Sequence, residues 1–501
     1  MKRIFTLMTA TLVLGATQAT AQRYLEEVFD DVQVTTNVTY GENTTVLFVP
    51  VTGQFVKEEL KMDVYEPVGD TETSRPVVLY FHTGNFLPHP TNGSPGGTRN
   101  DSATVEICTR LAKMGYVVAS CSYRLGWNPI AETQEQRVNT LINAAYRGVQ
   151  DARTAARFFR RNVAEDSNEY GIDPTRIVAW GQGTGGYISL AASTIDAYTD
   201  ILLPKFTLAT DPPFPMVIES INGDIFGTSV GVIPGTTDTL CYPNHVGFSS
   251  DFAACVNMGG ALGDLSWLDA GDGPFISFHT PTDPFAPYEN AVLIVPGANL
   301  PVVEVDGSFN VQEACAGFGN NDSWADSNLD DGFSQAANLL NQGFDGLYPL
   351  VRPASQPADS APWEWWSPDN VNNNNGLLTN PEMSAMKGRA FVDTIIGYAA
   401  PRLSCALSLP ENPCGNTINV EETDLAPKFS VFPNPASTVL TLKGEFTFER
   451  IEILDGFGKR VIDTTPRVTR IDLDVQQLPA GIYFVRATAQ GRIYTEKFLK
   501  N

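Results

Sequence analysis

Residues 176–186 read RIVAWGQGTGG, and this stretch decides how the rest of the chain is interpreted. The apolar run from Ile177 to Trp180 predicts a buried strand, and the run from Tyr187 to Ala192 predicts a helix. Between them, every second residue from Gly181 to Gly185 is glycine, the residue that best permits tight turns and close backbone contact. The stretch therefore predicts a sharp strand-to-helix turn.

The segments before this turn alternate between strands and helices. Continuous apolar runs at 76–82 and 116–122 predict strands buried on both faces. A helix is predicted over 102–113, and apolar positions at steps of three and four over 133–166 predict a long amphipathic helix. Alternating segments within 24–65, among them residues 46–50, predict antiparallel edge strands. Together these elements predict an α/β fold with a mostly parallel sheet and helices on both faces.

Five motifs, in this order and spacing, resemble the carboxylesterase and lipase branch of the α/β-hydrolase superfamily. They lie at residues 63–67, 76–86, 123–126, 151–159 and 171–186. The resemblance covers about residues 60–190 and implies an α/β-hydrolase fold, in which a catalytic serine occupies the centre of a G-x-S-x-G turn. Residues 273–288 further resemble the strand and loop that carry the acid of the family's catalytic triad.

The nucleophile that this resemblance implies is absent. Gly181 and Gly185 fall on the framing glycines of the turn, whereas Gly183 falls on the serine. Shifting the frame to recruit Thr184 fails, because Gln182 would then occupy a position where close packing requires glycine. Gly183 is therefore a vacant nucleophile position.

The triad histidine is absent as well. Asp283 falls on the triad acid, and in this fold the histidine follows the acid in the chain. All four histidines precede Asp283, namely His82, His89, His245 and His279. A second interpretation of Asp283 is a turn cap before Pro284. For His82 and His279, which each end a predicted strand, structural hydrogen bonds are expected.

The positions that form the family's oxyanion hole are altered in their side chains. Thr83, Gly84 and Thr184 fall on these positions, and Thr83 and Asn85 replace two glycines of the loop. The donor from Thr184 is a backbone N–H group, which does not depend on the side chain. The resemblance thus implies that an oxyanion-hole-like arrangement of donors persists.

Three functions are compatible with these residues. The first is a secreted α/β-hydrolase-fold protein that has lost serine-hydrolase chemistry and binds a small molecule or a glycan in the inherited cleft. The second is a carboxylic ester hydrolase that uses a non-standard constellation. The third is a surface interaction protein with a vestigial cleft. None of the three requires a cofactor.

Two further segments are candidates for ligand contact. Asp326, Asn328 and Asp330 alternate as in calcium-binding loops, but Asp331 stands where an EF-hand loop has glycine, and a solvated acidic loop is the alternative. Residues 363–366 read WEWW and predict either a lid over the cleft or exposed aromatic side chains that stack on sugars or partner surfaces.

Composition and charge restrict the partners of the chain. The 501 residues carry a formal net charge of -24, which disfavours nucleic acid and anionic lipid because phosphate binding depends on Lys and Arg. Residues 1–21 predict a secretory signal peptide, and no other stretch is apolar for the roughly 20 residues that a membrane span needs. Arginines cluster on the predicted helix at 133–166, where a solvated face is expected: Arg147, Arg153, Arg157, Arg160 and Arg161.

The C-terminal segment predicts a separate domain. Residues 22–415 are expected to form the α/β-hydrolase-like domain, and residues 416–428 predict a polar linker. From 429 the apolar period changes to two, which predicts a small β-sandwich over 429–501. The motifs at 432–435, 478–484 and 497–500 resemble the C-terminal sorting domain of type IX secretion cargo. This resemblance implies export through the periplasm to the outer surface or the medium by the type IX machinery, with a carbohydrate-binding sandwich as the alternative.

Seven cysteines in an exported chain predict disulfide bonds with one thiol left over. Cys405 and Cys414 would close a short loop, and Cys241 and Cys255 would close another. Cys108 and Cys121 could also meet, or remain buried thiols, which leaves Cys315 unpaired.

Overall fold

The computed structural model describes residues 22–89, 91–295, 297–325, 327, 329–351, 359–410, 412–414, 429–455, 460–489 and 492–501. The chain divides into two compact units, one up to Gly415 and one from Asn416. The predicted signal peptide and all of the predicted linker lie outside the described residues.

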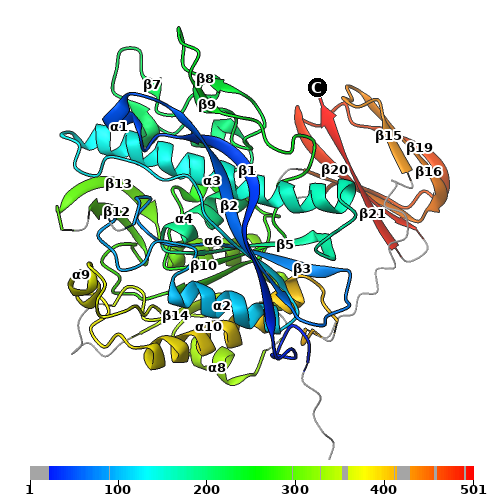
Figure 1. Ribbon diagram of the computed structural model, residues 1–501. Coiled ribbons are helices and arrows are strands. Elements are labelled where there is room, and N and C mark those ends of the chain that lie inside the picture. Colours follow the sequence, from blue (N-terminus) through cyan, green and yellow to red (C-terminus); the bar gives the residue numbers. More distant parts are fainter. Residues whose placement is uncertain are drawn as a thin grey trace, which may run out of the picture. The chain divides into compact units, whose positions relative to one another are not determined.

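An eight-stranded sheet organises the first unit, with the strand order β1-β2-β4-β3-β5-β10-β11-β14 (Figure 1). Its edge is antiparallel, since β2 pairs antiparallel with both β1 and β4. From β4 to β14 every neighbouring pair is parallel. The strands are β1 Val32–Thr45, β2 Val56–Pro67, β3 Arg75–Phe81, β4 Val117–Cys121, β5 Ile172–Gln182, β10 Ala254–Met258, β11 Phe275–His279 and β14 Leu347–Pro349.

Helices cover both faces of this sheet, and each face has its own apolar core. One core joins the sheet to α3, α4 and α6, and the other joins it to α2 and α10. Figure 1 shows α2 and α10 together on one side of the sheet and α3 on the other. The helices are α2 Ser102–Lys113, α3 Gln134–Glu165, α4 Thr184–Thr194, α6 Ser308–Phe318 and α10 Ala385–Ala406. This arrangement confirms the predicted α/β-hydrolase fold.

Shorter elements connect the main ones. The hairpin of β12 (Asn290–Val295) and β13 (Leu300–Asp306) lies outside the large sheet. The strand expected at residues 46–50 is wrong, because Pro50 enters the one-turn helix α1 (Val49–Thr52). The remaining short elements are β6 Thr207–Leu208, β7 Phe214–Pro215, α5 Glu219–Asn222, β8 Gly231–Val232, β9 Thr239–Cys241, α7 Asp322–Ala325, α8 Gly332–Asn338 and α9 Asn373–Leu377.

The second unit is the predicted β-sandwich. One sheet has the order β15-β16-β19 and the other β18-β17-β20-β21, and apolar side chains of both sheets form a common core. The strands are β15 Phe429–Phe432, β16 Val439–Phe448, β17 Arg450–Asp455, β18 Arg460–Thr464, β19 Val468–Asp474, β20 Gly481–Ala489 and β21 Arg492–Lys500.

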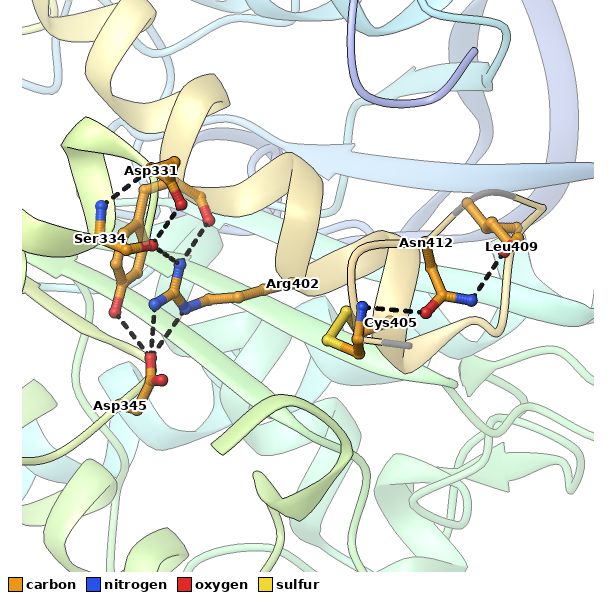
Figure 2. The surroundings of a disulfide bond; sticks show 9 residues. Asp331, Ser334, Asp345, Arg402, Cys405, Leu409 and Asn412 are labelled. Carbon is orange, nitrogen blue, oxygen red and sulfur yellow. Dashed lines mark hydrogen bonds and ion pairs between the residues drawn. A yellow bond between two sulfur atoms is a disulfide. The ribbon is translucent and has the colours of Figure 1, made fainter. Parts of the chain in front are cut away.

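One disulfide bond is present among the described residues, between Cys405 and Cys414 at the end of α10, as predicted (Figure 2). One turn earlier on α10, the buried Arg402 pairs with Asp345 and donates to Ser334, which anchors the helix end. The other five cysteines are buried free thiols.

The predicted bond between Cys241 and Cys255 is therefore wrong. Cys255 belongs to the central strand β10 and packs into the sheet core, whereas Cys241 ends the small strand β9 and lies 3.8 Å from the amide nitrogen of Asn43. Apolar packing accounts for Cys255, and burial beside the Asn43 amide accounts for Cys241, without a covalent bond between them.

The solvated face expected for the arginines of α3 is wrong for two of them, whereas Arg161 is partly exposed and pairs with Asp166. Arg153 and Arg157 are buried and donate mainly to backbone carbonyl groups, among them those of Ala192 and Asn244. Beside them, Asp151 forms a fully buried ion pair with Arg124 in the loop after β4. These contacts tie the long helix to the loops that follow the strands.

Candidate functional site

The turn between β5 and α4 has the sharp geometry that its glycines predict. Gly183 adopts φ 55° and ψ -117°, a conformation that L-residues rarely take. A Cβ atom at Gly181 would lie 1.9 Å from the carbonyl oxygen of Gly185, and one at Gly185 would lie 1.9 Å from that of Phe81. The framing glycines are thus required by close backbone contact, and the central residue is presented at the end of the strand.

Thr83 fills the space beside Gly183 that a nucleophilic side chain would need. An ideal Cβ atom built on Gly183 would lie 2.2 Å from Oγ1 and 3.0 Å from Cβ of Thr83. Such distances lie well inside van der Waals contact, so a serine at 183 cannot be accommodated while Thr83 keeps its position. The two departures from the family's pattern are therefore spatially complementary.

Thr184 has a hydroxyl group but no base to activate it. Its Oγ1 lies 3.0 Å from the hydroxyl of Tyr123, which itself donates to the backbone carbonyl of His82 at 2.8 Å. Because the phenolic hydrogen of Tyr123 bonds to that carbonyl, the Thr184 hydroxyl is the donor in the hydrogen bond between Thr184 and Tyr123. Activation of a hydroxyl nucleophile requires a proton acceptor with basic character, which a buried phenol does not supply. Burial indeed raises the pKa of Tyr123.

One backbone donor of the predicted oxyanion positions, that of Thr184, remains next to the vacant position. The N–H groups of Thr184 and Gly84 donate to no other described residue. Thr83 and Thr184 line the same cavity as Gly183, whereas Gly84 packs against Gly97, where an added Cβ would lie 2.8 Å from Cα. The structure thus brings together three of the predicted residues and places Gly84 behind them.

Asp283 caps a turn and also faces the cavity. Its Oδ1 accepts hydrogen bonds from the backbone N–H groups of Phe285 at 2.7 Å and Ala286 at 3.3 Å, and its Oδ2 accepts from the hydroxyl of Ser360 at 3.0 Å. Enclosure by protein raises the pKa of Asp283 to about 7, because desolvation of the carboxylate outweighs these hydrogen bonds. Ser360 is therefore the side chain that bonds to Asp283, at the place where a catalytic triad has histidine.

None of the four histidines, all of which are described, bonds to Asp283. His279 is buried and uses both ring nitrogens, Nδ1 with the hydroxyl of Ser308 at 2.7 Å and Nε2 with the carbonyl of Ala286 at 3.1 Å. Burial lowers the pKa of His279 to about 4. His82 stacks on Tyr123 with ring centroids 4.6 Å apart, and burial lowers its pKa. Both rings make the structural contacts that were expected of them.

Glu364 is a site residue that sequence reasoning missed. It lies in the WEWW segment, and its Oε1 accepts a hydrogen bond from Nε2 of Gln182, whose own Oε1 accepts from the hydroxyl of Tyr80 at 2.8 Å. Enclosure raises the pKa of Glu364 to about 8, mainly by desolvation, with Asp101 and Asp283 adding like charge. The sequence signal for Glu364 is its position between the tryptophans of the WEWW segment, which predicts a place over the cleft.

A cavity of about 790 Å³ joins these residues. Thr83, Gln182, Gly183, Thr184, Asp283, Ser360 and Glu364 line it together with Trp363 and Trp366. Apolar side chains complete the wall, from α3 and from the hairpin β12–β13 among others: Leu141, Ile142, Val149, Leu293, Val295 and Val303. The WEWW segment thus contributes to the cavity wall, as the lid interpretation predicted. A cavity of this size accommodates a drug-sized ligand.

The calcium prediction stays a prediction. Asp326 and Asn328 lie outside the described residues, and Asp330 is exposed. In the part of the chain that the structure describes, no three acidic, histidine or cysteine residues gather as metal ligands would. No helix of that part is long and apolar enough to cross a membrane.

Comparisons with known proteins cover both units. A family model described as BD-FAE matches residues 62–205, and one described as secretion system C-terminal sorting domain matches residues 430–501. Secreted lipase 5 of Gibberella zeae is 28% identical over 196 residues, which are 39% of this chain and 30% of the lipase. The chain therefore spans about a third of the length of that curated relative.

Solved structures of esterases are also similar at low identity. A truncated carbohydrate esterase from gut microbiota is 18% identical, with 59% of this chain and 86% of that chain covered and a TM-score of 0.32. Propionate-bound esterase 2 of Thermogutta terrifontis is 16% identical, with 70% of this chain and 92% of that chain covered and a TM-score of 0.32.

Proposed function

We propose that this chain, which is similar to esterases and lipases and matches a secretion-system sorting domain over residues 430–501, binds a small molecule in the inherited cavity without hydrolysing it. The sorting domain directs the chain to the cell surface or the medium. The proposed ligand would act, or be sequestered, outside the cell.

The position of Thr83 against Gly183 carries this proposal. Serine hydrolysis needs a hydroxyl at the turn, a histidine to take its proton and an acid to orient that histidine. Here the Thr83 side chain occupies the space of the serine side chain, and Ser360 contacts the acid in place of the histidine. Of the three triad members, only the acid, Asp283, is present. Loss of triad members leaves only the residual catalysis that binding and oxyanion donors provide.

The cavity supports a binding role. The Thr83 side chain lies where the nucleophile would be, and Ser360 contacts Asp283 where a histidine would. The cavity beside these residues remains large enough for a ligand. Two carboxyl groups line this cavity, where desolvation disfavours their charged forms and a ligand that donates hydrogen bonds would offset that cost.

The test is turnover of 4-nitrophenyl acetate and butyrate by the full chain beside an active esterase of the same fold. Turnover indistinguishable from a heat-denatured sample is expected, and Thr184→Val should leave it unchanged. A rate close to that of the active esterase, abolished by Asp283→Asn, would overturn the proposal and establish a carboxylic ester hydrolase with a substitute constellation.

A further inference from the structure

The cavity carries ionisable side chains of one sign. Among the described residues that line it, the titratable ones are Asp283, Glu364, Tyr146 and Tyr187. No lysine, arginine or histidine belongs to the described lining. A ligand with a carboxylate or phosphate group would therefore meet only acidic groups, and anionic ligands are disfavoured.

Glu364 is held in place with part of its hydrogen-bonding capacity unused. Gln182 donates to its Oε1 and is itself fixed by Tyr80, so the carboxyl group has a defined position in the wall. Its Oε2 accepts no hydrogen bond from any described residue, although the carboxyl lines the cavity. This oxygen is available to a donor on a ligand.

Among the described residues, neither carboxyl group has a cationic partner. The groups that act on Asp283 are backbone amides, Ser360 and Asp359, and those that act on Glu364 are Gln182 and two further carboxylates. An unpaired carboxylate in an enclosed site is unfavourable, whereas a hydrogen-bonded cation beside it offsets the cost of burial. Both carboxyl groups line the same cavity, so a positively charged group there would face acidic side chains from two parts of the wall.

Aromatic and apolar side chains make up much of the remaining wall. Trp127, Trp363 and Trp366 line the cavity, and the faces of tryptophan rings attract cations. Helix α3 and the hairpin β12–β13 add aliphatic side chains that would bury a hydrocarbon group. The wall thus suits a molecule with a cationic head and an apolar body.

We infer that the cavity selects a cationic amphiphile, an alkyl or arylalkyl amine whose ammonium group lies against Glu364 and Asp283 and whose apolar body contacts α3 and the β12–β13 hairpin. The inference rests on the proposed binding function and names the chemical class of its ligand.

Isothermal titration calorimetry on the full chain at pH 8 tests the inference with three probes of the same skeleton: 4-phenylbutylamine, 4-phenylbutanol and 4-phenylbutyrate. The amine should bind at least tenfold more tightly than the alcohol, and the carboxylate should bind most weakly. Glu364→Gln and Asp283→Asn should each reduce this preference for the amine at least fivefold. Glu304→Gln is the matched control, because Glu304 is exposed on β13 and does not line the cavity; it should change nothing.

The three possible failures have different meanings. Equal binding of amine and alcohol, or tighter binding of the carboxylate, overturns the charge selection but leaves the binding function intact. An amine preference that survives both acid substitutions overturns the assignment to Glu364 and Asp283. Absence of binding by all three probes overturns the inference together with the proposed function. Because the wild-type comparison needs no variant, poor folding of a variant does not prevent a decision.

Discussion

At the scale of single residues, Gly183 and Thr83 illustrate how two departures from a sequence pattern become one structural change. The pattern alone identified Gly183 as the vacant position, because glycine at the centre of the turn removes the hydroxyl. It could not show that the Thr83 side chain fills the vacated space, since the two residues are a hundred positions apart and meet only through the pairing of β3 with β5.

Restoring serine alone should destabilise the protein. In Gly183→Ser the new side chain overlaps Thr83 and adopts an unfavourable backbone conformation, which costs about 1–3 kcal/mol before the overlap is counted. Thr83→Gly removes the overlap, so the double variant should lose less stability than the two single losses added together. Urea unfolding of all four proteins measures this coupling, and additive losses would contradict it.

The carboxyl group of Glu364 should leave a pH signature. The folded state keeps a proton that the unfolded chain loses above its ordinary pKa of 4.5, because enclosure raises the pKa of Glu364 to about 8. Its contribution to stability is therefore complete below about pH 4.5 and is lost as the pH rises toward 8. Glu364→Gln, which stays neutral, should show a shallower fall in Tm between pH 5 and 8 than wild type. Parallel curves for the two proteins, with Glu304→Gln as control, would refute this expectation.

At the scale of secondary-structure elements, periodicity predicted the helices and strands well, but it did not predict which distant residues their polar side chains contact. The long helix α3 follows from its apolar steps and from the capping box of Thr133 and Gln136. Its buried arginines could not be predicted, because a charged side chain that bonds to carbonyl groups of distant loops has no local signature. The contact between Gln182 and Glu364 could not be predicted either, because 182 positions separate the two residues.

The disulfide bond at the end of α10 gives an element-scale prediction. Cys405 and Cys414 are nine positions apart, and closing so short a loop stabilises a fold by up to about 3 kcal/mol in the chain-entropy model. The variant with serine at both positions should lose stability up to that amount, while the Arg402–Asp345 contact keeps the helix end anchored. Peptide mapping without reduction should find this bond and leave Cys241 and Cys255 free. A bond between Cys241 and Cys255 would show that their separate burial is described incorrectly.

At the scale of the whole molecule, the chain consists of two compact units, and the proposal assigns ligand binding to the first and export to the second. The sorting domain is needed only for export. We therefore predict a mature chain that begins near Gln22 and is cleaved within residues 416–428. Intact-mass measurement of protein recovered from the native cell surface or medium checks both ends. Recovery of a chain that retains residues 429–501 would count against trimming.

The central claim is that this α/β-hydrolase unit contains no activated nucleophile. A fluorophosphonate probe tests it most directly, because such probes form a covalent bond with an activated serine or threonine hydroxyl and with little else. The full chain, incubated with excess probe beside an active esterase and measured by intact-mass spectrometry, should keep its unmodified mass while the esterase gains one adduct. A stoichiometric adduct on this chain, mapped to Thr184, Ser360 or any other hydroxyl of the cavity, would contradict the claim.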